Sequence, residues 1–165
     1  MAVTIDTIVQ SSDVWGVKLE VTRGLPTWEA FPGMRHQKAL RRIAASIAPI
    51  DENTESCGCF EVADVYISFP DGSLKRPDLA IYCVEPADTD GATSELPAAV
   101  IEVVSPNYET KDFDLNPPFY LAHGIADVVI FDPRSLIVLH HQRDSVQRHT
   151  SPVQLDLVCG CRVTV

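Results

Sequence analysis

Apolar residues fall into short runs along the chain, and two of these runs are rich in β-branched side chains. Residues 79–84 and 98–104 are almost entirely apolar, which is typical of strands buried on both faces. Residues 14–23 and 60–69 alternate between apolar and polar positions, as half-buried strands do. Further strands are predicted later in the chain. They cover residues 128–131, 136–142, 153–158 and 161–165.

Helical periodicity is clearest over residues 35–48. The apolar stripe of this helix comprises Leu40, Ile43, Ala44 and Ile47. A second, short helix is predicted over residues 117–123, because Asn116 suits the N-cap, proline occupies the first helical position and Gly124 ends the helix. Since proline cannot donate a backbone hydrogen bond, we expect no helix to run through residues 112–120, and we expect Asn116 to be engaged in capping.

The remaining segments define the domain boundaries. Residues 1–13 show no clear period, so we expect a loose N-terminal arm or an edge strand there. Residues 25–33 contain two prolines and a glycine and are predicted to be a connector. Residues 14–165 then form a single domain, since a chain of this length can build one real core. The order of the elements indicates an α/β fold.

Charge limits the kinds of partner that are expected. The net charge of −10 counts against a broad nucleic-acid surface and predicts weak or salt-sensitive DNA binding. Arg35, Lys38 and Arg42 share one face of the predicted helix, which is either a solvated face or a patch that contacts nucleic-acid phosphates. No apolar run approaches the ~20 residues of a membrane span, and no signal peptide is recognisable. We therefore expect a cytoplasmic protein with no membrane partner.

The chain contains two Cys-Gly-Cys pairs and one further cysteine, Cys83. The spacing within each pair is tighter than that of most structural zinc sites. The odd number of cysteines and the lack of a signal peptide argue against a disulfide framework. We therefore expect reduced structural thiols, with Cys83 in the core, and a joint metal site stays open as the alternative.

Each of the two buried runs is associated with one acid. Asp78 stands at the start of the first run and Glu102 lies inside the second. An unpaired carboxylate is costly to bury, so each acid needs a cation or a hydrogen-bonding partner. If the strands are neighbours, both acids can converge on one point and bind a hard divalent cation. Glu20, in the strand over residues 14–23, is either a solvated strand acid or a third member of this group.

The motifs around these acids resemble those of the Uma-two family of the PD-(D/E)XK superfamily. The resemblance covers about residues 17–142. It is carried, in order, by Leu19-Glu20-Val21-Thr22-Arg23-Gly24, Arg35-His36-Gln37, Pro77-Asp78, Glu102-Val103-Val104-Ser105-Pro106, Asp112, Tyr120, Gly124 and Asp132-Pro133. It implies a restriction-endonuclease-like mixed β-sheet flanked by two main helices. It also implies an Mg²⁺- or Mn²⁺-dependent endonuclease that hydrolyses phosphodiester bonds in DNA. Members of the superfamily commonly dimerise, so a homodimer stays open as a partner.

The same resemblance implies roles for individual residues. Asp78 and Glu102 would bind the metal, and the backbone carbonyl of Val103 would complete the set. Glu20 would bind the metal directly or through water. From its position in the chain alone, His36 is expected to be a surface or helix-start residue rather than a ligand.

The sequence departs from the family at its catalytic lysine. The usual superfamily position, two residues after the second acid, is Val104, and the position typical of the Uma-two family is Asn116. Lys111 is the nearest substitute for the basic role, unless it is a solvated loop charge; His123 is a weaker one. Two functions therefore stay open: a metal-dependent endonuclease, or a catalytically inactive relative that binds nucleic acid or protein. An unrelated acidic α/β domain is a third interpretation.

Overall fold

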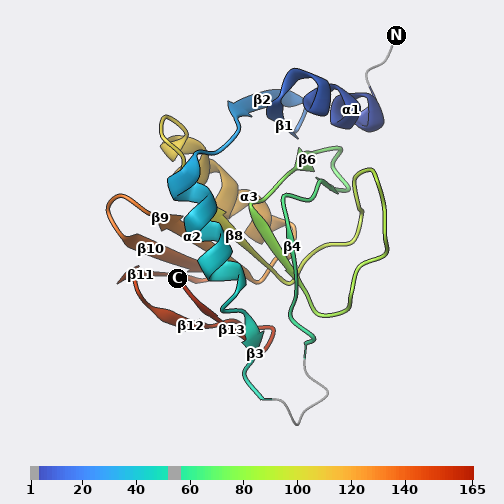
Figure 1. Cartoon of the computed structure of the whole chain (residues 1–165). Coiled ribbons are helices and arrows are strands. Elements are labelled where there is room, and N and C mark those ends of the chain that lie inside the picture. The colour runs from blue at the N-terminus through green and yellow to red at the C-terminus, as the bar shows by residue number, and fades with distance from the viewer. Residues whose placement is uncertain (1–3, 52–56) are drawn as a thin grey trace.

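A six-stranded mixed β-sheet forms the centre of the computed structural model, which describes residues 4–51 and 57–165 (Figure 1). Its strand order is β11-β10-β9-β8-β7-β4, and neighbouring strands are antiparallel except for the parallel pair of β8 and β9. The strands are β4 (Phe60–Ala63), β7 (Leu79–Tyr82), β8 (Ala99–Val103), β9 (Asp127–Asp132), β10 (Ile137–Gln142) and β11 (Ser145–Thr150). The prediction of a mixed α/β fold is confirmed.

Two smaller sheets extend this centre. One has the order β2-β1-β6-β5 and consists of β1 (Val17–Thr22), β2 (Leu25–Ala30), β5 (Ile67–Ser68) and β6 (Leu74–Lys75). The other has the order β12-β13-β3 and consists of β3 (Ala48–Pro49), β12 (Gln154–Asp156) and β13 (Cys161–Thr164). The predicted strand over residues 60–69 is thus divided between two sheets, with a break at Asp64, whose φ is 58°.

Two helices cover opposite faces of the central sheet, as predicted. Helix α2 (Met34–Ala44) packs Leu40 and Ile43 against the face that carries Ile81 and Ile101. Figure 1 shows α2 crossing this face of the sheet. Helix α3 (Asn116–Ala122) packs Phe119 and Tyr120 against the other face. Because alternate residues of β7 and β8 point to opposite faces, both strands are buried along their whole length.

The N-terminal third of the chain differs from the prediction in two places. Residues Ile5–Trp15 form a helix, α1, instead of a loose arm or an edge strand, and Val9 of this helix packs against Leu74. The segment predicted to be a connector is strand β2, paired with β1 through a two-residue turn at Arg23-Gly24. Since β2 is an edge strand, Pro26 removes no hydrogen bond that the sheet requires.

A continuous helical segment crosses the two prolines, contrary to the prediction. A π-helical turn, η1 (Lys111–Leu115), leads directly into α3, and the backbone N–H of Asn116 bonds to the carbonyl of Lys111. The prolines occupy the first turn of α3, where a missing N–H is tolerated, and the wider π turn carries the chain into them. The side chain of Asn116 makes no capping bond and points elsewhere.

The cysteines also differ from the prediction. Disulfides join Cys57 to Cys83 and Cys59 to Cys161, so the two Cys-Gly-Cys pairs do meet in space. The expectation of reduced thiols is therefore wrong for these four residues, because strand pairing brings distant segments together in a way that spacing alone does not reveal. Cys83 follows β7 and is not part of the buried core. Within the described ranges, no helix has the length and apolar character needed to cross a membrane.

Candidate active site

Strands β7 and β8 bring the two predicted acids together. Their register pairs Leu79 with Ile101, so Asp78 and Glu102 occupy the next positions of the same ladder. The backbone N–H of Asp78 donates to Oε2 of Glu102 over 3.1 Å, and the N–H of Val103 donates to Oδ2 of Asp78 over 2.8 Å. Asp78 is 8% exposed and Glu102 is 1% exposed. The two carboxylates therefore converge in a largely dry environment, as expected for neighbouring strands.

Glu20 joins them from β1. The pairing of β1 with β6 carries Glu20 to the start of the segment that leads into Asp78. Its Oε1 accepts the backbone N–H of Arg76 over 2.8 Å, while Oε2 lies 3.5 Å from the ammonium of Lys75 and 3.7 Å from that of Lys111. Glu20 is buried and is thus a member of the cluster rather than a solvated strand acid.

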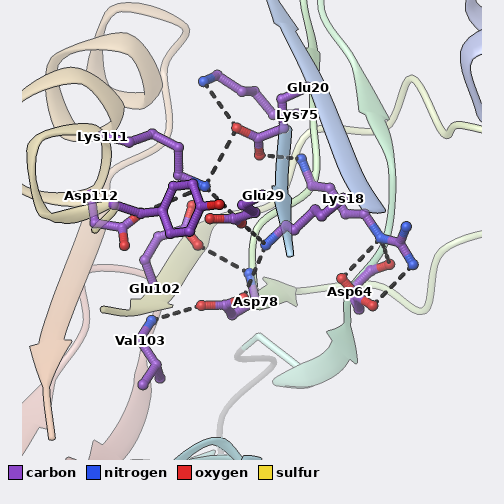
Figure 2. Close-up of polar contacts among 12 residues, drawn as sticks. Lys18, Glu20, Glu29, Asp64, Lys75, Asp78, Glu102, Val103, Lys111 and Asp112 are labelled. Carbon is purple, nitrogen blue, oxygen red and sulfur yellow. Dashed lines mark hydrogen bonds and ion pairs between the residues drawn. The ribbon is translucent and has the colours of Figure 1, made fainter. Parts of the chain in front are cut away.

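Three lysines reach the acids from three different elements (Figure 2). Lys18 of β1 donates to Oδ1 of Asp78 over 3.0 Å. Lys111 of η1 donates to Glu29 over 2.9 Å and lies 3.7 Å from Oδ1 of its neighbour Asp112. Lys111 is therefore part of the site, as the sequence suggested, and not a solvated loop charge. Lys18 and the third lysine, Lys75, were not predicted.

Asn116 occupies the position where the family resemblance implied a lysine, and its side chain is fully buried in the site. Its Nδ2 donates to Oε1 of Glu102 over 3.1 Å, and its Oδ1 accepts from the ammonium of Lys75 over 2.9 Å. The hydroxyl of Tyr120 donates to the same Glu102 oxygen over 3.1 Å. Asn116 thus connects the acid pair to a lysine that comes from the sheet, instead of capping the helix.

His36 also belongs to the site, although it was expected at the surface. Its Nε2 lies 2.9 Å from Oδ2 of Asp78, and the residue is buried on the same face of α2 as Leu40 and Ile43. The sequence contained the signal, because His36 precedes Leu40 by four residues and so extends the apolar stripe of the helix.

The cluster contains more acids than bases. The acids are Glu20, Glu29, Asp78, Glu102 and Asp112, and the lysines are Lys18, Lys75 and Lys111. Five carboxylates against three ammonium groups leave two negative charges without a lysine partner. Divalent cations with oxygen ligands supply the matching charge.

Two acids respond to this excess by binding protons more tightly. Burial, with the nearby charge of Asp78, raises the pKa of Glu102 to about 8. Burial, with the nearby charge of Glu29, raises the pKa of Asp112 to about 7. Without a further cation, both carboxyl groups are therefore partly protonated near neutral pH.

Glu20 and Asp78, the other two candidate metal ligands, are held ionised. Burial alone would raise the pKa of Glu20, but Lys111 and Lys75 lower it to about 2. Burial would likewise raise the pKa of Asp78, yet Lys18 and His36 hold it well below its usual range. Asp78 and Glu20 thus present permanent negative charge, whereas Glu102 exchanges its proton.

A small pocket of about 110 Å³ opens beside Asp78. Since a water molecule takes up ~30 Å³ of liquid, this volume admits an ion with a few waters. Its polar lining includes Lys18, Glu29, His36, Asp78, Ser105 and Asp112. A second pocket reaches the acid cluster from the side of β2 and η1. Its lining includes Trp28, Tyr108 and Lys111.

The predicted basic patch lies elsewhere. Arg35, Lys38 and Arg42 line a separate groove that also includes Phe131 and Pro152. Because successive residues of a helix are rotated by about 100°, this face of α2 points away from the face that directs its histidine to Asp78. The structure therefore does not bring these three residues into the acid cluster.

The place of Lys18 in the acid cluster could be predicted from the sequence, whereas that of Lys75 could not. Lys18 precedes Glu20 by two residues, so both point to the same side of β1, and this spacing was available from the sequence. Lys75 follows a Pro-Asp-Gly turn, where lysine is usually solvated, and only the pairing of β6 with β1 buries it.

Comparisons with known proteins agree with this fold. The model of the Uma2 family, described as "Putative restriction endonuclease", matches residues 15–161. A solved structure from Anabaena variabilis ATCC 29413, described as "a putative nuclease belonging to DUF820", is similar with a TM-score of 0.67 and 16% sequence identity, over 93% of this chain and 88% of that chain. None of the curated proteins matches significantly. The chain belongs to the Uma2 family, and this membership supports a nuclease role.

Proposed function

We propose that this protein is a divalent-metal-dependent endonuclease that hydrolyses phosphodiester bonds in DNA. The observation that carries the proposal is the buried cluster at the ends of β7 and β8, whose acids exceed its lysines by two charges. Asp78 and Glu102 would hold Mg²⁺ or Mn²⁺ together with the backbone carbonyl of Val103. Glu20 would assist, directly or through water. These are the hard oxygen donors that such ions prefer.

A bound ion would supply Lewis-acid stabilisation of the phosphate and a more acidic bound water. The residues of the chain would do the rest. Asp78 is kept ionised by Lys18 and His36 and so offers a carboxylate at any physiological pH. Glu102 is oriented by Asn116 and Tyr120, which both donate to its Oε1. The orientation of both acids is therefore fixed before a substrate arrives.

The basic role falls to Lys111 in this proposal. It lines the pocket between β2 and η1, whereas Lys75 lines none of the pockets beside the cluster. Lys75 is 2% exposed and lies between Asn116, Glu20 and the ring of Phe119. We therefore assign Lys75 a positioning role and Lys111 the contact with the reacting water or phosphate.

DNA is the proposed partner, and its binding should be weak or sensitive to salt because the chain carries a net charge of −10. Arg35, Lys38 and Arg42 remain the proposed phosphate contacts, on DNA that extends past α2 away from the acids. A homodimer would allow two sites to cut opposite strands, and sedimentation equilibrium would measure its mass.

Cleavage of supercoiled plasmid at low salt with Mg²⁺ or Mn²⁺ tests the function. The parent should nick the plasmid, Glu102→Ala should not, and Glu61→Ala, an exposed glutamate on β4, should behave like the parent. Mn²⁺ binding, followed by electron paramagnetic resonance, should weaken in Asp78→Ala and Glu102→Ala. If both variants bind Mn²⁺ like the parent, the ligand assignment is wrong.

The alternative function is an inactive member of the family that keeps the fold and binds nucleic acid or protein. The missing lysines at residues 104 and 116 favour it. A folded, monodisperse parent that binds Mn²⁺ but leaves the plasmid intact would establish this alternative.

A further inference from the structure

All five cysteines of the chain lie in one cluster, although they come from three distant segments. Cys57 and Cys59 precede β4, Cys83 follows β7, and Cys159 and Cys161 flank the turn into β13. Cys59 and Cys161 are 102 residues apart in sequence, with Cα atoms 5.8 Å apart. The cluster therefore joins the C-terminal strand to the central sheet.

Cys57 lies at the centre of this cluster. Its sulfur is within 4.8 Å of those of Cys83 and Cys159, and these three are mutually within that distance. The same holds for Cys57, Cys59 and Cys161, and the sulfurs of Cys57 and Cys161 are 3.5 Å apart. Four thiolates around one Zn²⁺ at ~2.3 Å have their sulfurs about 3.8 Å apart. The non-bonded Cys57–Cys161 pair already lies near this spacing, and reduction would allow the sulfurs of the two disulfides to separate to it.

The surroundings suit a structural metal. Cys57, Cys59 and Cys161 are buried and pack with apolar residues of β12 and β13. The fifth cysteine, Cys159, lies inside the cluster as a free thiol, whereas two independent cross-links would require no fifth sulfur. The two disulfides are also in contact with each other through Cys57 and Cys161, as the ligands of one ion would be.

We propose that the reduced protein binds one Zn²⁺ at this cluster, through Cys57, Cys59, Cys161 and a fourth thiolate from Cys83 or Cys159. Metal binding replaces thiol protons and changes no oxidation state. Each disulfide is first opened by two equivalents of a thiol reductant, which becomes a disulfide in turn. The disulfide-bonded and metal-bound forms exclude each other, because a disulfide sulfur is not a thiolate ligand.

The site is distinct from the acid cluster. Asp78 precedes β7 and Cys83 follows it, so the two sites lie at opposite ends of one strand. Five residues of a strand span about 16 Å. Zinc here would hold the fold together and would take no part in phosphodiester cleavage.

Titration of the reduced, metal-free protein with Co²⁺ tests the proposal. We expect one equivalent to give the sulfur-to-cobalt charge-transfer absorption and the visible bands of tetrahedral Co²⁺, both removed by Zn²⁺. Cys161→Ser should weaken Co²⁺ binding by at least about 100-fold, beyond the 10–100-fold effect of outer-shell changes. Of Cys83→Ser and Cys159→Ser, the one that leaves the absorption unchanged is not the fourth ligand.

Two controls make the result decisive. Glu102→Gln should leave the charge-transfer absorption intact, because oxygen ligands give no such band, so failure of this proposal and failure of the proposed nuclease function are distinguishable. The oxidised parent should give no band. A reduced, folded parent without the absorption, or an oxidised parent with it, would overturn the zinc site even if Cys161→Ser did not fold.

Discussion

The exchange of Lys75 and Asn116 is the most informative perturbation of the acid cluster. The family resemblance implied a lysine at position 116, and the structure has asparagine there, bonded to a lysine from β6. We predict that Lys75→Met and Asn116→Lys each destabilise the protein, and that the double variant is more stable than the sum of the two effects. The ammonium would then reach the same point from the helix instead of the sheet.

The magnitude follows from the hydrogen bonds and ion pairs that each change removes. Lys75→Met leaves Oδ1 of Asn116 buried without its donor, which costs about 1–3 kcal/mol. It also removes one partner of the buried Glu20 carboxylate, for which about 3–5 kcal/mol is usual. Since Lys111 and the N–H of Arg76 still contact Glu20, we expect a total of about 2–4 kcal/mol.

The second single change has the opposite defect. Asn116→Lys places a second ammonium beside Lys75 in a fully buried position and removes a donor to Glu102. Like charges without solvent repel strongly, so a loss of similar size is expected. In the double variant one ammonium remains. Its loss of stability should therefore be about 1–3 kcal/mol smaller than the sum of the losses in the two single variants.

Urea unfolding of the four proteins, with equal m-values, measures this cycle. Plasmid cleavage on the same samples shows whether activity follows. Strictly additive losses, or a double variant less stable than the sum predicts, would refute the argument that one ammonium can reach this point from either element.

Three other outcomes are expected. In the metal-free protein the pKa of Glu102 is about 8, against 4.5 in the unfolded chain, so the folded state binds more protons between these two pH values. The stability that this carboxyl group contributes is therefore fully present below pH 4.5 and is lost as the pH rises through about 8. Glu102→Gln should flatten this part of the pH dependence of thermal unfolding. Mg²⁺ should raise the melting temperature of the parent more than that of Asp78→Asn, measured by calorimetry. Replacing Arg35, Lys38 and Arg42 by alanine should make DNA binding less dependent on salt and leave the Mn²⁺ affinity unchanged. The slope of log binding constant against log salt concentration should fall by about 0.9 for each phosphate that the protein no longer neutralises. An unchanged slope would show that these three residues do not contact DNA.

The sequence revealed most of the central sheet because its strands are buried on both faces. Runs such as residues 98–104 have no other simple interpretation, and the acid within that run required a partner wherever it lay. Helix α1 and strand β2 were missed for the opposite reason. Both are exposed along much of their length, so neither has the regular apolar pattern on which a prediction depends.

Contacts between distant segments set the remaining limits. Lys75 resembles a turn lysine until β6 pairs with β1, and the five cysteines resemble unrelated thiols until β13 docks near β7. The prediction that Asn116 caps the helix was wrong because it considered only the local sequence, whereas the preceding π turn directs its side chain into the acid cluster. For Lys75 and the disulfide-bonded cysteines the decisive neighbours are more than 20 residues away, where local pattern carries no information.

The balance of charge in the cluster bears on whether the family member is active. A purely structural group could pair every acid with a base, and this chain does so elsewhere, as with Asp156 and Arg162. The cluster instead holds two more acids than lysines, and burial raises the pKa of Glu102 to about 8. Such an arrangement costs folding free energy in the absence of an ion. The lysine missing from residues 104 and 116 is offset by Lys18, Lys75 and Lys111, while the carboxylate oxygens are retained. This combination supports the proposed metal site over an inactive remnant.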